Sequence, residues 1–370
     1  MSKWVLSLVF LLSVIEIATA QIQKSPNNRV YVDDDYQYTE TVRRTRSVNA
    51  HLENGTKFYK SGDYKSALEA FRSAVTLDPS VFVSQFNLGV THLHLSDTKS
   101  AINCLQQAVT IDRASASAWH FLGFALYQAG HNAEAIKSYK RALEIDRELA
   151  ATWNNLGQVY LETEKLDDAQ VAFSKALDLK PDLSEPVNGL CITYARLKKS
   201  EEAVSFCAKS RRVAPSLMNA YYLAWSYLDL KKFPDAIALL NECVRLDPQK
   251  PIVYTALAEA YYHQQRYKEA LSYAQKALQI SPDSQTGLAV LGHIYFGMKK
   301  MKDAKKMFEK ALSVEPESPV SRYNLAMTCL ALNQRDCARE QYAILKTIEP
   351  GLSVQLFDQI YKGKIIRLMK

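Results

Sequence analysis

The feature that most constrains the fold of this chain is an alanine that returns with a fixed period over most of its length. Every step is 34 residues except one of 33, and the positions are Ala67, Ala101, Ala135, Ala169, Ala203, Ala236, Ala270, Ala304 and Ala338. A period of this length indicates repeated supersecondary units that bury their apolar surfaces against one another. The chain is therefore expected to fold as a stack of similar units.

The unit from Ala150 to Leu183 carries the pattern most completely. Its first half places apolar residues at helical spacing, and a polar break at residues 163–165 separates it from a second apolar stripe. Pro181 ends the second stripe, because proline lacks an amide donor and clashes with the preceding turn. Each stripe is too narrow to enclose a core. The pattern thus predicts two antiparallel helices that need neighbouring units.

The residues of this unit resemble the tetratricopeptide repeat family, whose 34-residue unit carries a Trp, Leu-Gly, Tyr, Ala, Phe, Ala, Pro pattern. The matching residues here are Trp153, Leu156, Gly157, Tyr160, Ala169, Phe173, Ala176 and Pro181. Nine units fit between residues 48 and 352, starting at Val48, Phe82, Ala116, Ala150, Ser184, Leu217, Pro251, Gln285 and Pro319. The resemblance implies an all-α fold, an α-solenoid or right-handed superhelix of about nine helix-turn-helix hairpins, whose first helices line the concave surface.

Residues 353–370 follow the ninth unit and combine apolar side chains with Lys and Arg. The open end of a repeat stack needs a cover for its apolar flank. We therefore expect a C-terminal capping helix. A membrane-surface helix is the alternative, but Gly363 interrupts any longer amphipathic run.

Residues 1–20 resemble a secretory signal peptide, with a basic residue, an apolar run and small residues that end at Ala20. A permanent anchor is the alternative. It is disfavoured because the run is shorter than the ~20 residues of a spanning helix and contains Glu16. Residues 21–47 have no apolar period and predict a flexible arm. We expect an exported protein, periplasmic or secreted, without a transmembrane segment once the signal is cleaved.

The positions that face the concave surface carry the functional prediction, because the repeat pattern leaves them free to vary. They are rich in aromatic and amide side chains, which suit a protein or peptide segment held by apolar contact and backbone hydrogen bonds. The alternative is that several of them pack between adjacent repeats. The candidate groove residues are Phe86, His120, Phe124, Tyr127, Asn154, Gln158, Tyr221, Trp225, Tyr262, His263, His293 and Phe296. Glu259, Tyr323 and Met327 are expected on the same surface.

Basic residues gather in the turns of units five to eight. Because equivalent turns lie along one edge of a stack, they predict a basic rim of Lys199, Lys232, Arg266, Lys299 and Lys300. Ordinary solvated turns are one explanation of this rim, and contact with an anionic surface or an acidic partner is the other. The net charge of +7, from 46 basic and 39 acidic residues, is modest and gives no reason to expect specific nucleic-acid binding.

One arrangement known in relatives is not matched. Tetratricopeptide domains that hold the acidic C-terminus of cytosolic chaperones grip a carboxylate with Lys, Asn and Arg from three first helices. Here Asn87 occupies one such position, but the neighbouring helices offer Leu52, Thr56, Ser117 and Phe121. The resemblance therefore does not predict a carboxylate-binding groove.

Motifs for catalysis are absent from the sequence. It contains no HExxH zinc signature, no Gly-rich phosphate loop and no GxSxG elbow. His92 and His94 share a helix with no carboxylate at ligand spacing, so a polar surface is favoured over a metal site. We expect no enzymatic activity, no cofactor and no metal.

Six cysteines in a protein expected to be exported raise the question of pairing. Cys191 and Cys207 lie on the two helices of the fifth unit at levels that could face each other, and Cys329 and Cys337 flank the ninth turn. The alternative is that these cysteines replace core residues as buried thiols. The sequence leaves both readings open.

The sequence as a whole predicts an exported, non-enzymatic scaffold that binds a protein segment along its concave surface. Two alternatives use the same fold. The chain could be an accessory subunit that serves a cell-envelope or glycan-modifying enzyme, or a structural protein that assembles with copies of itself.

Overall fold

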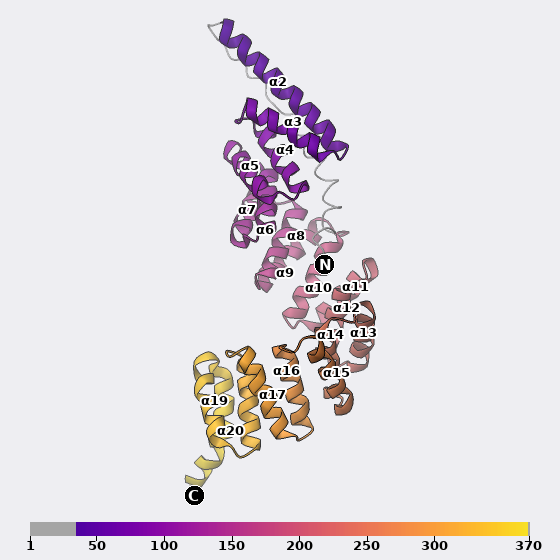
Figure 1. The fold of residues 1–370 in the computed structure, drawn as a ribbon, viewed down its shortest axis with the longest axis vertical. Helices are drawn as coiled ribbons and strands as arrows, with labels where there is room; N and C mark the ends of the chain where they lie inside the picture. Colours follow the sequence, from indigo (N-terminus) through magenta and orange to yellow (C-terminus); the bar gives the residue numbers. More distant parts are fainter. Residues whose placement is uncertain (1–34, 369–370) are drawn as a thin grey trace. The chain divides into compact units, whose positions relative to one another are not determined.

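The computed structural model describes residues 35–368 and the side chains of residues 40–361. Within these residues the chain forms 19 helices. Figure 1 labels most of them in chain order. The predicted signal peptide, residues 1–20, lies outside the described residues, as does the first part of the predicted arm. The helices are α2 (Asp35–Lys60), α3 (Tyr64–Leu77), α4 (Phe82–His94), α5 (Thr98–Ile111), α6 (Ala116–Gln128), α7 (Asn132–Ile145), α8 (Ala150–Glu162), α9 (Leu166–Leu179), α10 (Ser184–Arg196), α11 (Ser200–Val213), α12 (Leu217–Asp229), α13 (Phe233–Leu246), α14 (Pro251–His263), α15 (Tyr267–Ile280), α16 (Gln285–Gly297), α17 (Met301–Val314), α18 (Pro319–Ala331), α19 (Arg335–Ile348) and α20 (Pro350–Leu368).

The helices pair as antiparallel hairpins, and the chain divides into two compact units at Gly189 and Leu190. In the first unit the hairpins are α2 with α3, α4 with α5, α6 with α7 and α8 with α9. In the second unit they are α12 with α13, α14 with α15, α16 with α17 and α18 with α19, followed by α20. Within each unit the second helix of a hairpin also packs against the first helix of the next. This is the all-α repeat architecture that the 34-residue period predicts.

Eight first helices, α4 to α18, begin at the residues where the repeat period places the start of a unit. The exception is α2, which begins at Asp35, so residues 35–47 are helical and the prediction of a flexible arm is wrong for them. This segment contains no Gly or Pro to stop a helix. Arg44 also anchors it by donating from Nε to the carbonyl oxygen of Leu77 at 2.5 Å, at the end of α3.

The C-terminal helix also begins earlier than the sequence suggests. Helix α20 starts at Pro350 rather than at residue 353, because proline is favoured at the first position of a helix, where its missing N–H has no intrahelical partner. Leu356 and Ile360 on α20 are buried against the last hairpin in one cluster with Leu325 and Leu345. The helix therefore covers the apolar flank of the ninth unit.

Each hairpin turns through one residue with positive φ. In described residues these are Gly62, Ser96, Gly130, Glu164, Lys198, Lys231, Gln265, Lys299 and Asn333, with φ between 57° and 82°. A left-handed residue after a helix lets its last carbonyls find amide donors while the chain reverses direction. The same backbone solution thus recurs with nine different local sequences.

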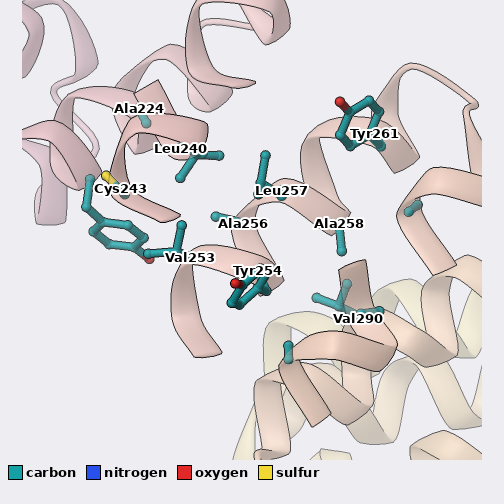
Figure 2. Packing of buried hydrophobic residues seen from close by; sticks show 14 of the residues in the cluster. Ala224, Leu240, Cys243, Val253, Tyr254, Ala256, Leu257, Ala258, Tyr261 and Val290 are labelled. Atoms are coloured by element: carbon teal, nitrogen blue, oxygen red, sulfur yellow. The ribbon is translucent and has the colours of Figure 1, made fainter. Parts of the chain in front are cut away.

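The repeating alanines mark the closest contacts of the fold. All nine have 0% of their surface exposed. Figure 2 shows part of the core of the second unit, where Ala224 and Leu240 of one hairpin lie near Val253 and Leu257 of the next. Small side chains at these positions let helices approach closely enough for the larger ones to interlock.

A second close contact joins two positions that are 16 residues apart in several hairpins. At Gly157 a Cβ atom would lie 2.8 Å from the ring of Phe173, and at Gly292 it would lie 2.7 Å from the ring of Phe308. These distances are too short for a normal contact, so the aromatic ring fills the space that the glycine leaves. This accounts for the Leu-Gly signature in physical terms.

In the fifth hairpin the same two positions hold Cys191 and Cys207, which form a disulfide with Cα atoms 4.6 Å apart. A second disulfide joins Cys329 and Cys337 across the ninth turn. Cys104 and Cys243 are free thiols, and Cys243 is buried. The sequence leaves open whether the cysteines form disulfides or remain buried thiols, and in the structure four of them form disulfides.

Candidate peptide-binding cleft

The groove residues predicted in the first unit are largely engaged with other side chains of the same unit. Phe86 is 3% exposed and packs edge-on against the ring of Phe121. His120 is buried as well, and its Nδ1 lies 2.7 Å from Oγ1 of Thr152 on the neighbouring first helix. Both side chains therefore contribute to packing between repeats.

The remaining polar candidates in this unit also have partners. The Tyr127 hydroxyl donates a hydrogen bond to Oε1 of Glu162, and Gln158 donates from Nε2 to the same oxygen at 3.2 Å. Asn154 is 9% exposed and contacts the side chain of the adjacent asparagine. Phe124 is half-buried. These three polar candidates therefore already have hydrogen-bond partners within the first unit.

Tyr221 and Trp225 are neighbours on one face of α12, and only Trp225 is partly exposed. Tyr221 is 8% exposed, and its ring lies 5.9 Å from the ring of Trp225, which is half-buried. Burial raises the pKa of the Tyr221 hydroxyl, and the charge of Glu259 raises it further. The Tyr221 hydroxyl is therefore close enough to Glu259 of α14 for that charge to act on it.

The four other predicted groove residues converge on a single cleft in the second unit. Its volume is about 510 Å³, and it is lined by three consecutive first helices, α14, α16 and α18, with one ring from α17 behind them. The lining residues are Glu259, Tyr262, His263, Val290, His293, Phe296, Phe308, Tyr323, Asn324 and Met327. This is the place where the structure brings sequence-predicted residues from different units together.

Helical spacing explains why these residues meet. Glu259, Tyr262 and His263 are separated by three and four residues and so share one face of α14, as His293 and Phe296 do on α16. The ring of His293 lies 6.4 Å from that of Tyr262 across the cleft. Three copies of the same helix face thus form a continuous aromatic surface that stays partly accessible.

The electrostatics of the cleft centre on Glu259. Burial raises the pKa of its carboxyl, and the carboxylate of Asp229 on α12 raises it further, to about 7. Among the described residues the structure records no hydrogen bond and no ion pair for this side chain. At neutral pH the cleft therefore holds a carboxyl group poised between its acid and its ionised form.

The imidazole of His293 lies on the facing helix. Burial lowers its pKa, a hydrogen bond with Asn324 opposes this shift, and the nearby His263 adds to it. His263 itself is exposed and stacks on Phe233 with ring centroids 5.5 Å apart. The cleft thus combines aromatic rings with one carboxyl and two imidazole groups.

Glu259 is the residue that sequence reasoning placed on this surface without singling out as a site. Its signal is the ninth position of units two to nine, where the first helices otherwise carry apolar, amide or imidazole side chains. That series reads Val90, Phe124, Gln158, Ile192, Trp225, Glu259, His293 and Met327. Only the structure shows that the described residues lining the cleft include no Lys or Arg beside the Glu259 carboxyl.

The predicted basic rim lies at the hairpin turns of the second unit, and all five of its residues are exposed. Lys199, Lys232, Arg266 and Lys300 stand at the N-caps of second helices. Acidic residues occupy the first turn of each of these helices: Glu201, Glu202, Asp235, Glu269 and Asp303. The rim therefore alternates in charge rather than forming a uniformly positive edge.

A second cleft of about 780 Å³ lies in the first unit between α7, α8 and α9. Its apolar floor includes Trp153, whose Nε1 donates to the carbonyl oxygen of Arg147 at 2.9 Å, and the exposed Val171. Charges of both signs surround it: Lys140, Glu144, Arg147, Glu148, Asp168, Lys175 and Asp178. No predicted groove residue lines this cleft.

The described residues contain neither a candidate metal-binding cluster nor a membrane-spanning helix. In this part of the chain no group of three or more His, Cys, Asp or Glu side chains is arranged to hold a metal ion. No helix of residues 35–368 is both long and apolar enough to cross a bilayer.

Comparison with known protein families gives three matches. Residues 146–349, which are 204 of the 370 residues, match the family model described as the cilia and flagella-associated protein 70 C-terminal domain. Residues 123–164 match a TPR repeat model and residues 52–118 a tetratricopeptide repeat model. A comparison with curated protein sequences finds no match.

Among solved structures, the APC/C hetero-tetramer Cut9-Hcn1 is similar with a TM-score of 0.55 at 14% identity, covering 83% of this chain and 75% of that one. The protein MamA is 25% identical with a TM-score of 0.43, covering 45% of this chain and 92% of its own. Yeast Tom70 is 16% identical with a TM-score of 0.41, covering 85% and 77%. The likeness to Cut9 supports the repeat fold.

Proteins built from these repeats are generally non-enzymatic scaffolds for protein interactions. The period, the hairpins and the family matches agree. The chain belongs to the tetratricopeptide repeat family.

Proposed function

We propose that this protein is an exported, non-enzymatic scaffold that binds a segment of a partner protein in the cleft lined by α14, α16 and α18. One observation carries the proposal: predicted groove residues from two of these helices converge on an accessible, mainly aromatic cleft. Aromatic side chains provide large contact areas at low entropic cost, and an extended or helical peptide would fit along three parallel helix faces.

Two observations support export. The first is the resemblance of residues 1–20 to a signal peptide. The second is the pair of disulfides, Cys191 with Cys207 and Cys329 with Cys337. Disulfides persist in oxidising compartments such as the periplasm and the cell exterior, and are rare in the cytosol. A periplasmic or secreted location is therefore part of the proposal.

The basic rim is not part of the proposed binding site. Arg266 pairs with Glu269, with Nη2 and Oε1 2.8 Å apart, and comparable acids stand beside the other rim residues. An acidic partner would meet both charges along this edge. The rim fits the solvated-turn explanation better.

The proposal can be tested by panning a random dodecapeptide phage library against the full chain. We expect enriched peptides that bind the native chain and lose binding when Tyr262→Ala and Phe296→Ala are combined. A matched control combines Val213→Ala and Leu246→Ala, which truncate exposed apolar side chains of the same unit at 65% and 58% exposure. Peptides that bind the cleft variant and the native chain equally would contradict the proposal.

A further inference from the structure

Glu259 lies in the cleft without a cation. Three first helices line the cleft, and the described residues that line it include no Lys or Arg. The carboxylate of Asp229 at the end of α12 acts on Glu259 with a charge of the same sign. A carboxyl that is mostly buried beside another acid is unfavourable when ionised, because neither water nor an opposite charge compensates it.

The surroundings of Glu259 are those that recognise a cation. Tyr262 lies one helical turn away on α14, and Phe296 and Tyr323 line the cleft from α16 and α18. The faces of aromatic rings attract positive charge through their quadrupole, most strongly when water is excluded. A cationic side chain in this cleft would gain from the carboxylate and from the rings together.

We propose that the cleft recognises a partner segment through a Lys or Arg side chain that pairs with the Glu259 carboxylate between the rings of Tyr262 and Phe296. This inference rests on the proposed function and specifies its ligand. Apolar side chains next to the cation would occupy the part of the cleft around Val290 and Met327. The partner is therefore a basic, partly apolar protein segment.

Other ligand classes fit the cleft less well. An acidic segment would add a third negative charge beside Glu259 and Asp229. A wholly apolar segment would remove the remaining water from Glu259 and leave its carboxyl unpaired. The chemistry is thus opposite to that of the chaperone-binding relatives, which hold a carboxylate.

Binding should depend on pH with a defined sign. A cation favours the ionised carboxylate, so affinity should rise as pH rises through about 7, the value to which burial and Asp229 raise the pKa of Glu259. The other titratable groups near it are Tyr221 on α12, Tyr262 and His263 on α14, His293 on α16 and Tyr323 on α18. The cleft lining includes no residue of α13 or α15. A protonated His293 would repel a cation and so act in the same direction.

The test uses the full chain and the peptides enriched by panning a random dodecapeptide library at pH 8. We expect enrichment of Lys or Arg next to aromatic or aliphatic residues. A synthetic copy of the consensus peptide is then compared with an analogue in which Lys is replaced by norleucine, or Arg by citrulline. Dissociation constants are measured for the native chain and for Glu259→Gln by fluorescence anisotropy at pH 6, 7 and 8.

We expect the double-mutant cycle between Glu259→Gln and the neutral peptide to give a coupling of about tenfold or more at pH 8, with less at pH 6. Glu259→Gln keeps both histidines, so the pH dependence that it removes belongs to Glu259. Thermal melting of Glu259→Gln checks that the variant folds. A second variant, Glu259→Lys, should reduce binding further.

Three outcomes would overturn the inference in distinguishable ways. Peptides without basic residues, or a coupling near onefold, would refute cation recognition. If either of these results is found but Tyr262→Ala with Phe296→Ala still abolishes peptide binding, only cation recognition is refuted and the proposed function stands. A library that yields no cleft-dependent peptide would contradict the proposed function and this inference together.

Discussion

The two units use equivalent inward positions of the repeat differently. We compare these positions on the hairpins α6 to α9 of the first unit with those on the helices α14, α16 and α18 of the second. In the first unit His120 contacts Thr152, and Tyr127 and Gln158 both donate to Glu162. In the second unit Glu259 has no recorded partner among the described residues, and it faces an accessible cleft. The repeat fixes where a side chain points, and its neighbours decide whether it remains available.

Repeat position alone is therefore a weak guide to binding residues. Polar and aromatic residues on a concave surface are equally compatible with pairing between repeats and with ligand contact. The informative feature is a polar group whose partner is missing, because burying it unpaired is costly unless function retains it. The variants below test this division of roles.

The largest effect is expected for binding. Combining Tyr262→Ala with Phe296→Ala should weaken a cleft-binding peptide about a hundredfold, roughly 3 kcal/mol, because central aromatic contacts dominate such interfaces. Isothermal titration with a panned peptide measures it. The matched change in the first unit, Phe124→Ala with Tyr127→Ala, should leave affinity within about twofold. A larger loss there would erase the comparison.

The next largest effect concerns the fifth hairpin, where a disulfide replaces the glycine and ring of other hairpins. Cys191→Ala with Cys207→Ala should lower the free energy of unfolding by about 3 kcal/mol, from the loop constraint and the lost contact. Cys191→Gly with Cys207→Phe recreates the Gly157 and Phe173 pairing and should recover part of it. Urea denaturation of the native chain and the two double variants measures both changes. An equal loss in the two double variants would show that the packing cannot substitute for the bond.

A third effect concerns the pH dependence of the free energy of unfolding, to which His120 contributes in the first unit. Burial lowers the pKa of His120 to about 4 in the folded state, from 6.5. The unfolded chain therefore binds more protons between these values, and the stabilisation present above pH 6.5 is lost as pH falls towards 4. His120→Gln cannot titrate, so its stability should fall by about 2 kcal/mol less than the native protein's between pH 7 and pH 4. Urea midpoints at both pH values provide the measurement, and parallel losses would contradict it.

The smallest effect has the opposite sign and lies in the second unit. The folded-state pKa of Glu259 is raised from 4.5 to about 7, so the folded chain binds more protons in that interval and stability falls as pH rises through it. Glu259→Gln removes this loss. Without ligand it should be about 1 kcal/mol more stable than the native chain at pH 8 and close to it at pH 4.5. A variant less stable at pH 8 would indicate a hidden partner for Glu259.

The sequence predicted the fold in detail because the residues that make the same contacts recur in each repeat. The spacing of the alanines and the prolines placed eight helix starts at the observed residues. It failed for residues 35–47, where polar residues carry no apolar period and the helix depends on contacts such as that from Arg44 to Leu77. A repeat period cannot predict a helix that a long-range hydrogen bond helps to stabilise.

The candidate site was less predictable for a related reason. Tyr262 and His293 could be placed on one surface from their positions in the repeat, and the structure brings them together. Phe86 and His120 occupy the same type of position, yet they are buried by their neighbours. Whether a side chain is covered depends on residues about 34 positions away, and this pairing is visible only in three dimensions.

The most direct test of the central claim is hydrogen-deuterium exchange of the full chain with and without a panned peptide. We expect added protection within residues 251–331, which hold α14, α16 and α18, and little change within residues 116–162, which hold α6 and α8. Glu259→Gln should reduce this protection at a fixed peptide concentration. Protection that appeared within residues 116–162 and spared residues 251–331 would contradict the assignment of the binding site.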